Sequence, residues 1–361
     1  MRIAVDLTSI SYHLTGIERY AVSVTDEMIN LDEKNEYILI FRDKVYPIFE
    51  DRIKKENVSA VILHGDNKLL FLQYTLARAL NKIVADKYLF FAYPSPLLFK
   101  RKGIINTIHD MSAWDSAEEA QTLNKYYFRI SYRNAAKVSE KIITVSNFSK
   151  ERITKILGIE DNKVEVINSA VYEKLITQEP VPFSIIKKKY QLPDKYILSL
   201  STLEPRKNLQ ILLETYEKIA ANVDYDLVLV GRKGWKMDDV LECYKSKDRI
   251  HITGFVEDEH LSAVYKNALC FIFPSLYEGF GLPPVEALAL GLPVVSSDAA
   301  SLPEVLQDQA VYFHNNSKEE LQDILLNLSS ELELMPRSLT LTQKNNYSFV
   351  TAARKVLNIL K

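Results

Sequence analysis

The feature that most constrains this chain is an apolar run followed by a glycine-containing loop and a pair of prolines. The run at 268–273 has the length and composition of a strand buried in a parallel sheet. Gly279 and Gly281 permit a tight turn after that strand. Pro283 and Pro284 suit the first turn of a helix, where amides have no partner within the helix. A strand, a glycine loop and a helix N-terminus in this order are the usual geometry for holding an anion.

Two glutamates flank this loop, Glu278 within it and Glu286 in the first helical turn. Because the prolines remove two helix amides, the loop itself must supply most of the donors to an anion. Those amides belong to Gly279, Phe280, Gly281 and Leu282. A carboxylate aimed at a phosphate would repel it, so we expect both glutamates to accept hydrogen bonds from sugar or ribose hydroxyls. The alternative is a surface loop with two solvated acids.

The segment from Glu278 to Glu286, continued by GLPVV at 291–295, resembles the signature of the retaining family 4 glycosyltransferases. The resemblance implies an α/β protein with the GT-B fold, in which two Rossmann-like domains with parallel sheets face each other across a cleft. It also implies that the C-terminal helix returns to the N-terminal domain. In that family the first glutamate contacts the donor sugar, the second contacts the nucleotide ribose, and the loop amides contact the diphosphate and sugar.

The length of 361 residues is too great for one core and predicts two domains. We expect an N-terminal, acceptor-side domain at 1–175, completed by a C-terminal helix at 346–361. A nucleotide-sugar-binding domain follows at 190–345. Pro180, Pro182 and Pro193 mark 172–194 as the linker between the two domains.

Charge and cysteine content exclude several classes of protein. A formal net charge of −2 gives no polyelectrolyte footprint, so nucleic acid is not an expected partner. The two cysteines, Cys243 and Cys270, suggest a reducing compartment rather than a disulfide framework. The N-terminus lacks a signal-peptide pattern, and no apolar run approaches the ~18–20 residues of a membrane span. We therefore expect a cytoplasmic protein.

Strand-like and helix-like patterns alternate along the chain, which predicts βαβ units and parallel sheets. The strands expected in the first half are 2–8, 37–42, 60–64, 88–92, 104–109, 141–146 and 163–171, with a helix at 119–139. The strands expected in the second half are 195–201, 225–231, 249–255 and 268–273, and the tail at 347–361 is an amphipathic helix.

Two positions in the first half are candidate site residues. Gly16 opens a helix after the first strand, although a single glycine there is more often only a turn. The family resemblance implies that its segment, TGI-x-RY, borders the donor diphosphate, with Glu18 where members often have a second glycine. His109 ends a strand, and ligands of such sheets bind beyond the carboxyl ends of strands. A lone histidine is more often structural, but the resemblance implies a histidine against the donor sugar and acceptor. We therefore expect His109 in the active site.

Arg206 and Lys207 lie between a strand end and a helix start, where paired cations can hold a diphosphate and stabilise a departing nucleotide. The alternative is a solvated pair. Their segment, TLEPRKN, resembles the family pattern in which the arginine and lysine hold the diphosphate. Thr202 stands where many members carry a further arginine, which leaves Arg206 and Lys207 to supply the charge.

Phe255 and Val256 match the family segment whose backbone contacts the nucleotide base. Asp224 and Asp226 resemble the metal-binding Asp-x-Asp motif of the other large glycosyltransferase fold, but that motif follows its strand and this pair precedes one. We therefore expect no metal and no cofactor apart from the nucleotide sugar substrate.

The patterns and the family resemblance together predict a metal-independent glycosyltransferase that moves a sugar from a nucleotide diphosphate to an acceptor hydroxyl, and the resemblance implies that the transfer is retaining. The expected setting is bacterial cell-surface polysaccharide or glycoconjugate assembly, with a glycan or lipid-linked glycan as acceptor. One alternative is a nucleotide-sugar 2-epimerase of the same fold, which needs further catalytic carboxylates that the sequence does not reveal. The other is a catalytically silent GT-B partner protein, which would usually lose the residues that hold the donor.

Residues 67–85 and 97–102 combine apolar and basic side chains, which suggests peripheral membrane contact at the inner face of the membrane. The alternative is core packing of the helix, with its lysines and arginines reaching out to solvent.

Overall fold

The structure is a computed structural model that describes residues 1–11, 14–67, 70–115, 122–234, 236–244 and 247–361. The chain divides into two compact units. Unit 1 holds Met1–Asp115, the segment that ends at Ala170, and Asn345–Lys361, and unit 2 holds Val171–Lys344. No helix in the described ranges is both long and apolar enough to cross a bilayer.

Unit 1 is built on a seven-stranded sheet in the order β3-β2-β1-β4-β5-β6-β7, and all of its strand pairs are parallel. Its strands are β1 (Arg2–Asp6), β2 (Glu36–Arg42), β3 (Val58–Leu63), β4 (Lys87–Phe90), β5 (Ile104–Thr107), β6 (Lys141–Thr144) and β7 (Val164–Val166). In the register of the central strand, Val5 lies opposite Leu39 of β2 and Leu89 of β4. The central strands β1, β4 and β5 are buried along nearly their whole length, as expected for a parallel sheet covered on both faces.

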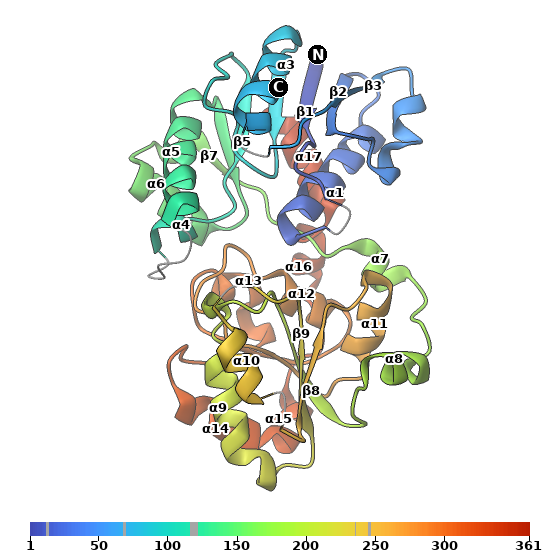
Figure 1. The fold of residues 1–361 in the computed structure, drawn as a ribbon, viewed down its shortest axis with the longest axis vertical. Helices are drawn as coiled ribbons and strands as arrows, with labels where there is room; N and C mark the ends of the chain where they lie inside the picture. The colour runs from blue at the N-terminus through green and yellow to red at the C-terminus, as the bar shows by residue number, and fades with distance from the viewer. Residues whose placement is uncertain (12–13, 68–69, 116–121, 235, 245–246) are drawn as a thin grey trace. The chain divides into compact units, whose positions relative to one another are not determined.

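Helices cover this sheet (Figure 1). They are α1 (Gly16–Leu31), α3 (Ala77–Lys82), α4 (Ser112–Asp115), α5 (Thr122–Val138), α6 (Asn147–Leu157) and α17 (Phe349–Ile359). A π-helical segment, η3 (Phe71–Leu76), leads directly into α3, and short 3-10 turns lie at Pro47–Phe49, Arg52–Lys54 and Asp161–Lys163. Phe71, Leu76 and Leu80 pack onto one sheet face. The C-terminal helix α17 packs along α1, so the end of the chain completes unit 1.

Unit 2 contains a six-stranded parallel sheet in the order β10-β9-β8-β11-β12-β13. Its strands are β8 (Tyr196–Leu200), β9 (Asp226–Val230), β10 (Ile250–Gly254), β11 (Phe271–Phe273), β12 (Val294–Ser297) and β13 (Val311–Phe313). Its helices are α7 (Glu173–Thr177), α8 (Phe183–Tyr190), α9 (Leu209–Ile219), α10 (Asp238–Tyr244), α11 (Asp258–Lys266), α12 (Leu282–Ala289), α13 (Leu302–Leu306), α14 (Lys318–Leu326) and α15 (Leu328–Leu334). The helix α16 (Leu341–Asn346) leads back towards unit 1, and 3-10 turns lie at Pro205–Lys207 (η5), Ala220–Asn222 and Gln307–Gln309.

Each sheet has a point where the strand order reverses, between β1 and β4 in unit 1 and between β8 and β11 in unit 2. Loops that leave such neighbouring strands run to opposite faces of the sheet and open a crevice at its carboxyl edge, where open α/β sheets bind ligands. The prediction of an α/β protein with two Rossmann-like parallel sheets is confirmed. The topology also makes the loops after these four strands the first places to look for a site.

Several elements differ from the sequence predictions. The last strand of unit 1 is Val164–Val166 rather than 163–171, and the expected linker 172–194 holds two helices, α7 and α8, that pack on α11. The helix expected at 67–85 is η3 followed by α3, and its residues 68–69 lie outside the described ranges. Neither β12 nor β13 was predicted from the sequence.

Candidate active site

The cation pair of unit 2 lies in the loop that follows β8. Pro205 begins the 3-10 turn η5, and Asn208 ends it with a φ of 53°, in the left-handed region that asparagine tolerates. Arg206 and Lys207 therefore project from a single turn at the carboxyl edge of the sheet. The helix α9 starts at the next residue after Asn208, and no side chain among the described residues caps it.

Hydrogen bonds hold both the side chain and the backbone of Arg206. Its Nε and Nη2 atoms donate to Glu204 Oε1 at 3.2 and 2.9 Å, and its Nη1 atom donates to the Tyr277 carbonyl oxygen at 3.1 Å. The Arg206 carbonyl oxygen in turn accepts from the Leu276 N–H at 2.9 Å. These bonds tie the loop after β8 to the loop after β11, so the guanidinium is fixed rather than solvated.

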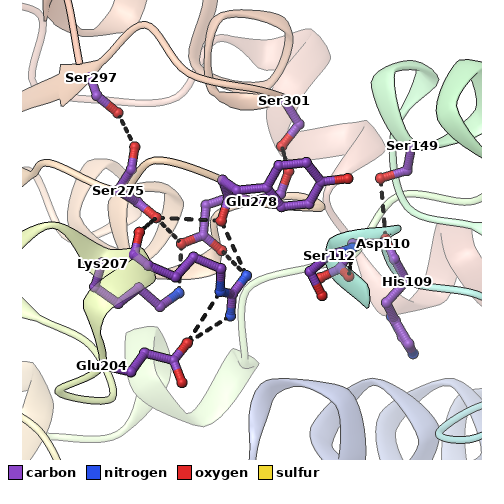
Figure 2. Close-up of polar contacts among 12 residues, drawn as sticks. His109, Asp110, Ser112, Ser149, Glu204, Lys207, Ser275, Glu278, Ser297 and Ser301 are labelled. Carbon is purple, nitrogen blue, oxygen red and sulfur yellow. Dashed lines mark hydrogen bonds and ion pairs between the residues drawn. The ribbon is translucent and has the colours of Figure 1, made fainter. Parts of the chain in front are cut away.

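Lys207 and Glu278 meet across the same pair of loops (Figure 2). The Lys207 ammonium donates to Glu278 Oε1 at 2.5 Å, and Arg206 Nη1 lies 4.0 Å from Glu278 Oε2. Both side chains are largely buried, with 13% of Lys207 and 10% of Glu278 exposed. The strand order explains this meeting, because β8 and β11 are hydrogen-bonded neighbours although the two residues are 71 positions apart.

Three buried serines support the Glu278 loop (Figure 2). Ser275 Oγ donates to Glu278 Oε1 at 2.7 Å, and Ser301 Oγ donates to the Glu278 carbonyl oxygen at 3.0 Å. Ser297 Oγ, on β12, donates to the Ser275 carbonyl oxygen at 2.5 Å. The carboxylate is thus positioned before any substrate contact, which is the condition for electrostatic preorganisation.

The charge state of Glu278 follows from these contacts. Burial by itself would raise the pKa of its carboxyl, but the charges of Lys207 and Arg206 and the hydrogen bonds from Lys207 and Ser275 outweigh burial. The pKa of Glu278 therefore lies below its usual value, and the side chain is an anion at neutral pH. As an anion it can only accept hydrogen bonds, so it suits ligand hydroxyls or cations.

The start of α12 is the third part of the site. Gly281 has a φ of 89°, and a Cβ atom on it would lie 2.6 Å from Leu302 Cδ2, so this position requires glycine. The prolines lie in the first turn, as predicted, and the described residues provide no side-chain cap. The helix dipole therefore directs partial positive charge out of this end of α12.

The remaining residues predicted in unit 2 lie around this centre. Glu286, in α12, is buried and accepts from the Tyr265 hydroxyl at 3.2 Å. Phe255 and Val256 follow β10, which is separated from β11 by two strands, a span of roughly 14 Å. Val256 is buried, whereas Phe255 is partly exposed and its ring centroid lies 4.2 Å from the Arg232 guanidinium carbon.

In unit 1, His109 follows β5 at the carboxyl edge of the sheet. Its Nε2 atom lies 2.8 Å from the Phe91 carbonyl oxygen, an acceptor, so Nε2 carries the proton and Nδ1 is the acceptor atom of the neutral ring. The Tyr20 ring packs edge-on against the imidazole at a centroid distance of 5.2 Å. Burial lowers the pKa of His109, partly offset by the Phe91 carbonyl and the Asp110 charge, so the imidazole is neutral at pH 7.

The helix start at Gly16 is closed by its own side chains. Glu18 Oε2 accepts from the Thr15 N–H at 2.9 Å, and Thr15 Oγ1 accepts from the Glu18 N–H at 3.5 Å, which completes a capping box. Ser11 Oγ also donates to Glu18 Oε2, at 3.2 Å. The carboxylate of Glu18 thus lies at the positive end of α1, where it disfavours a second anion.

The structure brings Arg206, Lys207 and Glu278 into contact and puts the loop to Leu282 at the start of α12. Asp224 pairs with Lys195, and Asp226 pairs with both Arg249 and His251. Sequence reasoning missed Glu204, Tyr265, Tyr20 and the supporting serines. Tyr20 and Glu204 carried a signal, since they belong to the TGI-x-RY and TLEPRKN segments singled out beside Gly16 and Arg206.

Comparisons with known proteins bear on the family of the chain. Residues 15–173 match the family model described as Glycosyltransferase Family 4, and residues 182–337 match the model described as Glycosyl transferases group 1. The chain is 28% identical to O-antigen chain mannosyltransferase B of Escherichia coli over 308 residues, which cover 81% of each protein. It is 31% identical over 246 residues to the serotype-specific mannosyltransferase WbdA of Escherichia coli, covering 64% of this chain and 30% of that longer protein.

Among solved structures, the chain resembles Anabaena HepE in complex with UDP and glucose with a TM-score of 0.72 at 15% identity. The similarity covers 100% of this chain and 99% of that chain. It also resembles WaaG, a glycosyltransferase involved in lipopolysaccharide biosynthesis, with a TM-score of 0.71 at 15% identity, over 99% of each chain. At these identities the similarity establishes the GT-B fold.

Proposed function

The chain belongs to the glycosyl transferases group 1, and from this premise we propose that it moves a sugar from a nucleoside diphosphate to an acceptor hydroxyl with retention of anomeric configuration. The observation that carries this proposal is the contact of Lys207, Arg206 and Glu278 beside the uncapped start of α12. Cations and a helix N-terminus suit a diphosphate, and the fixed carboxylate suits sugar hydroxyls.

The four charged side chains at this centre balance one another. Arg206 and Lys207 contribute two positive charges, and Glu204 and Glu278 contribute two negative ones. When the donor binds, its diphosphate competes with Glu278 for the Lys207 ammonium, and the sugar hydroxyls offer the carboxylate new donors. Binding is thus an exchange of partners, which limits the cost of desolvating each charge.

The same groups support departure of the nucleotide. As the glycosidic bond breaks, negative charge grows on the leaving diphosphate, and Lys207, Arg206 and the amides at the start of α12 face the region that would hold it. Fixed cations can supply this stabilisation, so we propose that the reaction needs no divalent metal. Glu286, held by Tyr265, is proposed to accept from the ribose hydroxyls.

His109 is proposed to accept a hydrogen bond from a hydroxyl of the transferred sugar or of the acceptor. The Phe91 carbonyl fixes its proton on Nε2, and this leaves Nδ1 as a neutral acceptor. In this role the imidazole of His109 transfers no proton but has to keep a fixed orientation. The Tyr20 ring and the Phe91 carbonyl oxygen hold it in that orientation.

The names of the relatives supply the proposed sugar and setting. Two of them are mannosyltransferases, one of the O-antigen chain and one specific to a serotype. We therefore propose mannose as the transferred sugar and a cell-surface polysaccharide as the product. Phe255, partly exposed beyond β10, is proposed to border the nucleotide base.

A turnover assay tests this function. The purified chain is incubated with GDP-, UDP- and dTDP-sugars and a mannose-containing oligosaccharide, and the anomeric configuration of the product is followed by NMR. We expect transfer from a mannose donor with retention, unchanged by EDTA. Inversion at the anomeric carbon would contradict the retaining mechanism, and loss of activity with EDTA would contradict the metal independence. Interconversion of the sugar at C2 would contradict the reaction class, because it would indicate an epimerase.

A further inference from the structure

Unit 1 carries an exposed surface that the transfer reaction does not use, and we call it the basic-apolar face. It is formed by the outer side of η3 and α3 and by the loop before β5. Its residues are Leu70, Tyr74, Arg78, Lys82, Val84, Leu98, Lys100, Arg101 and Lys102. Four of them, from Leu70 to Lys82, are spaced by four residues and so follow one side of the helix.

Large apolar side chains on this face are unusually open to solvent. Leu70, Tyr74 and Leu98 are 66%, 60% and 65% exposed, and Val84 is 73% exposed. The opposite side of the same helix is a packed core, with Phe71, Leu76 and Leu80 all nearly inaccessible. Core packing therefore explains the inner residues and leaves the outer ones without an explanation.

Positive charge accompanies these apolar residues. Lys100, Arg101, Lys102 and Val84 line a groove of about 730 Å³ at the amino ends of β4 and β5. The one carboxylate among the lining residues is Asp86, whose Oδ2 atom accepts from the Arg2 N–H at 2.8 Å. Arg78 and Lys82 on α3 are exposed as well. The described part of this face thus presents five basic side chains, and the groove adds the one acid, Asp86.

The two segments form one surface because they are tied together. The Leu97 N–H donates to Gln73 Oε1 at 2.8 Å, and Arg101 Nη2 donates to the Asn81 carbonyl oxygen at 2.8 Å. Phe99, between these contacts, is fully buried in the core beneath the helix. Leu98 and Lys100 therefore point outwards from a fixed loop.

We propose that the basic-apolar face docks on an anionic lipid bilayer. Exposed leucine and tyrosine side chains enter the interface between headgroups and acyl chains, while lysine and arginine ammonium and guanidinium groups bind lipid phosphates. Positive charge alone would suit any polyanion, but a nucleic acid or polyphosphate offers no apolar layer for Leu70, Val84 and Leu98. The combination of both chemistries selects the lipid surface.

The position of the face connects docking to the candidate site. In a βαβ unit the helix begins at the carboxyl edge of the sheet, so Leu70 and Tyr74 lie towards the edge that also bears Gly16 and His109. A bilayer along this face would border that edge and present lipid-linked hydroxyls near it. This last step rests on the proposed function, whereas docking itself does not.

Vesicle flotation tests docking without any activity measurement. The full-length chain is mixed with phosphatidylglycerol-containing vesicles or with neutral phosphatidylcholine vesicles at about 0.1 M salt. The variants are K100Q/R101Q/K102Q, Y74S/L98S and a matched control, K187Q/K188Q/K189Q, which removes three positive charges from α8 in unit 2. Circular dichroism is used to check that each variant is folded.

We expect the wild type and the control to float with anionic vesicles only. The K100Q/R101Q/K102Q variant should lose affinity on the order of 100-fold, since each basic residue near an anionic surface contributes about fivefold. The Y74S/L98S variant, whose charges are intact, should also bind more weakly. Absence of wild-type flotation, an equal loss in the control, or binding of polyphosphate without binding of vesicles would overturn the proposal. Flotation without glycosyl transfer would reject the proposed function and leave docking intact.

Discussion

The strand order of each sheet reverses next to one strand, β1 in unit 1 and β8 in unit 2. Side chains cap the helix that follows β1, whereas the described residues place no side-chain cap on the helix that follows β8. In unit 1, Thr15 and Glu18 cap the start of α1. In unit 2 the described residues place no side-chain cap on α9 or α12, and Arg206 and Lys207 lie beside them. Beside the point of strand reversal, the helix start therefore carries an acid, Glu18, in unit 1 and two cations, Arg206 and Lys207, in unit 2.

We propose that this difference places the two halves of the reaction in different units. A phosphate-binding edge needs an open helix N-terminus and cations, which unit 2 provides. The edge of unit 1 instead bears the Glu18 carboxylate, the neutral His109 and a buried Asp6, whose pKa burial raises to about 6 despite hydrogen bonds from Thr8. Hydrogen-bond acceptors of this kind suit hydroxyls, so we place the acceptor sugar at unit 1.

The largest expected effect comes from removing a cation in unit 2. Lys207→Ala should lower kcat/KM on the order of 100-fold and weaken binding of the nucleoside diphosphate, because the diphosphate loses a fixed cation. Steady-state kinetics and calorimetric titration measure the two effects. Lys218→Ala, which removes an exposed lysine from α9, is the matched control. If Lys207→Ala bound the nucleotide as tightly as the wild type, the proposal that unit 2 holds the diphosphate through this cation would be wrong.

A smaller effect should follow at Glu204, whose side chain accepts hydrogen bonds from the Arg206 guanidinium. Glu204→Ala frees the guanidinium from its carboxylate partner and should lower kcat/KM about tenfold. Glu204→Gln retains an acceptor oxygen and should recover part of the loss. The control is Glu217→Ala, which removes an exposed acid from α9. If both Glu204 variants had the same kinetics as this control, Glu204 would not position Arg206.

Glu18 tests the closed helix of unit 1. Glu18→Ala should cost about 1 kcal/mol in the free energy of unfolding, because it removes one arm of the capping box. Glu18→Gln keeps the bond to the Thr15 N–H without the charge and should be nearly as stable as the wild type. Neither variant should lower donor affinity in a calorimetric titration. A clear drop with Glu18→Gln would mean that Glu18 contacts the donor.

The smallest expected effect concerns the pH dependence of His109. Its pKa in the fold lies below the usual 6.5, so the unfolded chain binds the proton first as pH falls. Stability contributed by neutral His109 is complete above about pH 6.5 and declines below it. Urea unfolding at about pH 7.5 and 5.5 should show a smaller decline for His109→Gln than for the wild type. Identical declines would indicate that the imidazole is not held neutral.

The sequence predicted the parts of the site better than their contacts. The glycine loop, the prolines in the first turn of α12 and the cations after β8 could be predicted because each depends on neighbours in the chain. The pairing of Lys207 with Glu278 could not, because it depends on the order of β8 and β11 in the sheet. Glu204 was missed because an acid before Pro-Arg-Lys has no periodicity that separates it from a solvated residue.

A crystal structure of the chain with a nucleoside diphosphate would test the central claim most directly. The predicted result is a diphosphate within hydrogen-bonding distance of Lys207 Nζ and the Arg206 guanidinium, against the first amides of α12, with Glu278 turned away from it. A diphosphate bound at the start of α1, beside Thr15 and Glu18, would contradict the assignment of donor and acceptor to the two units.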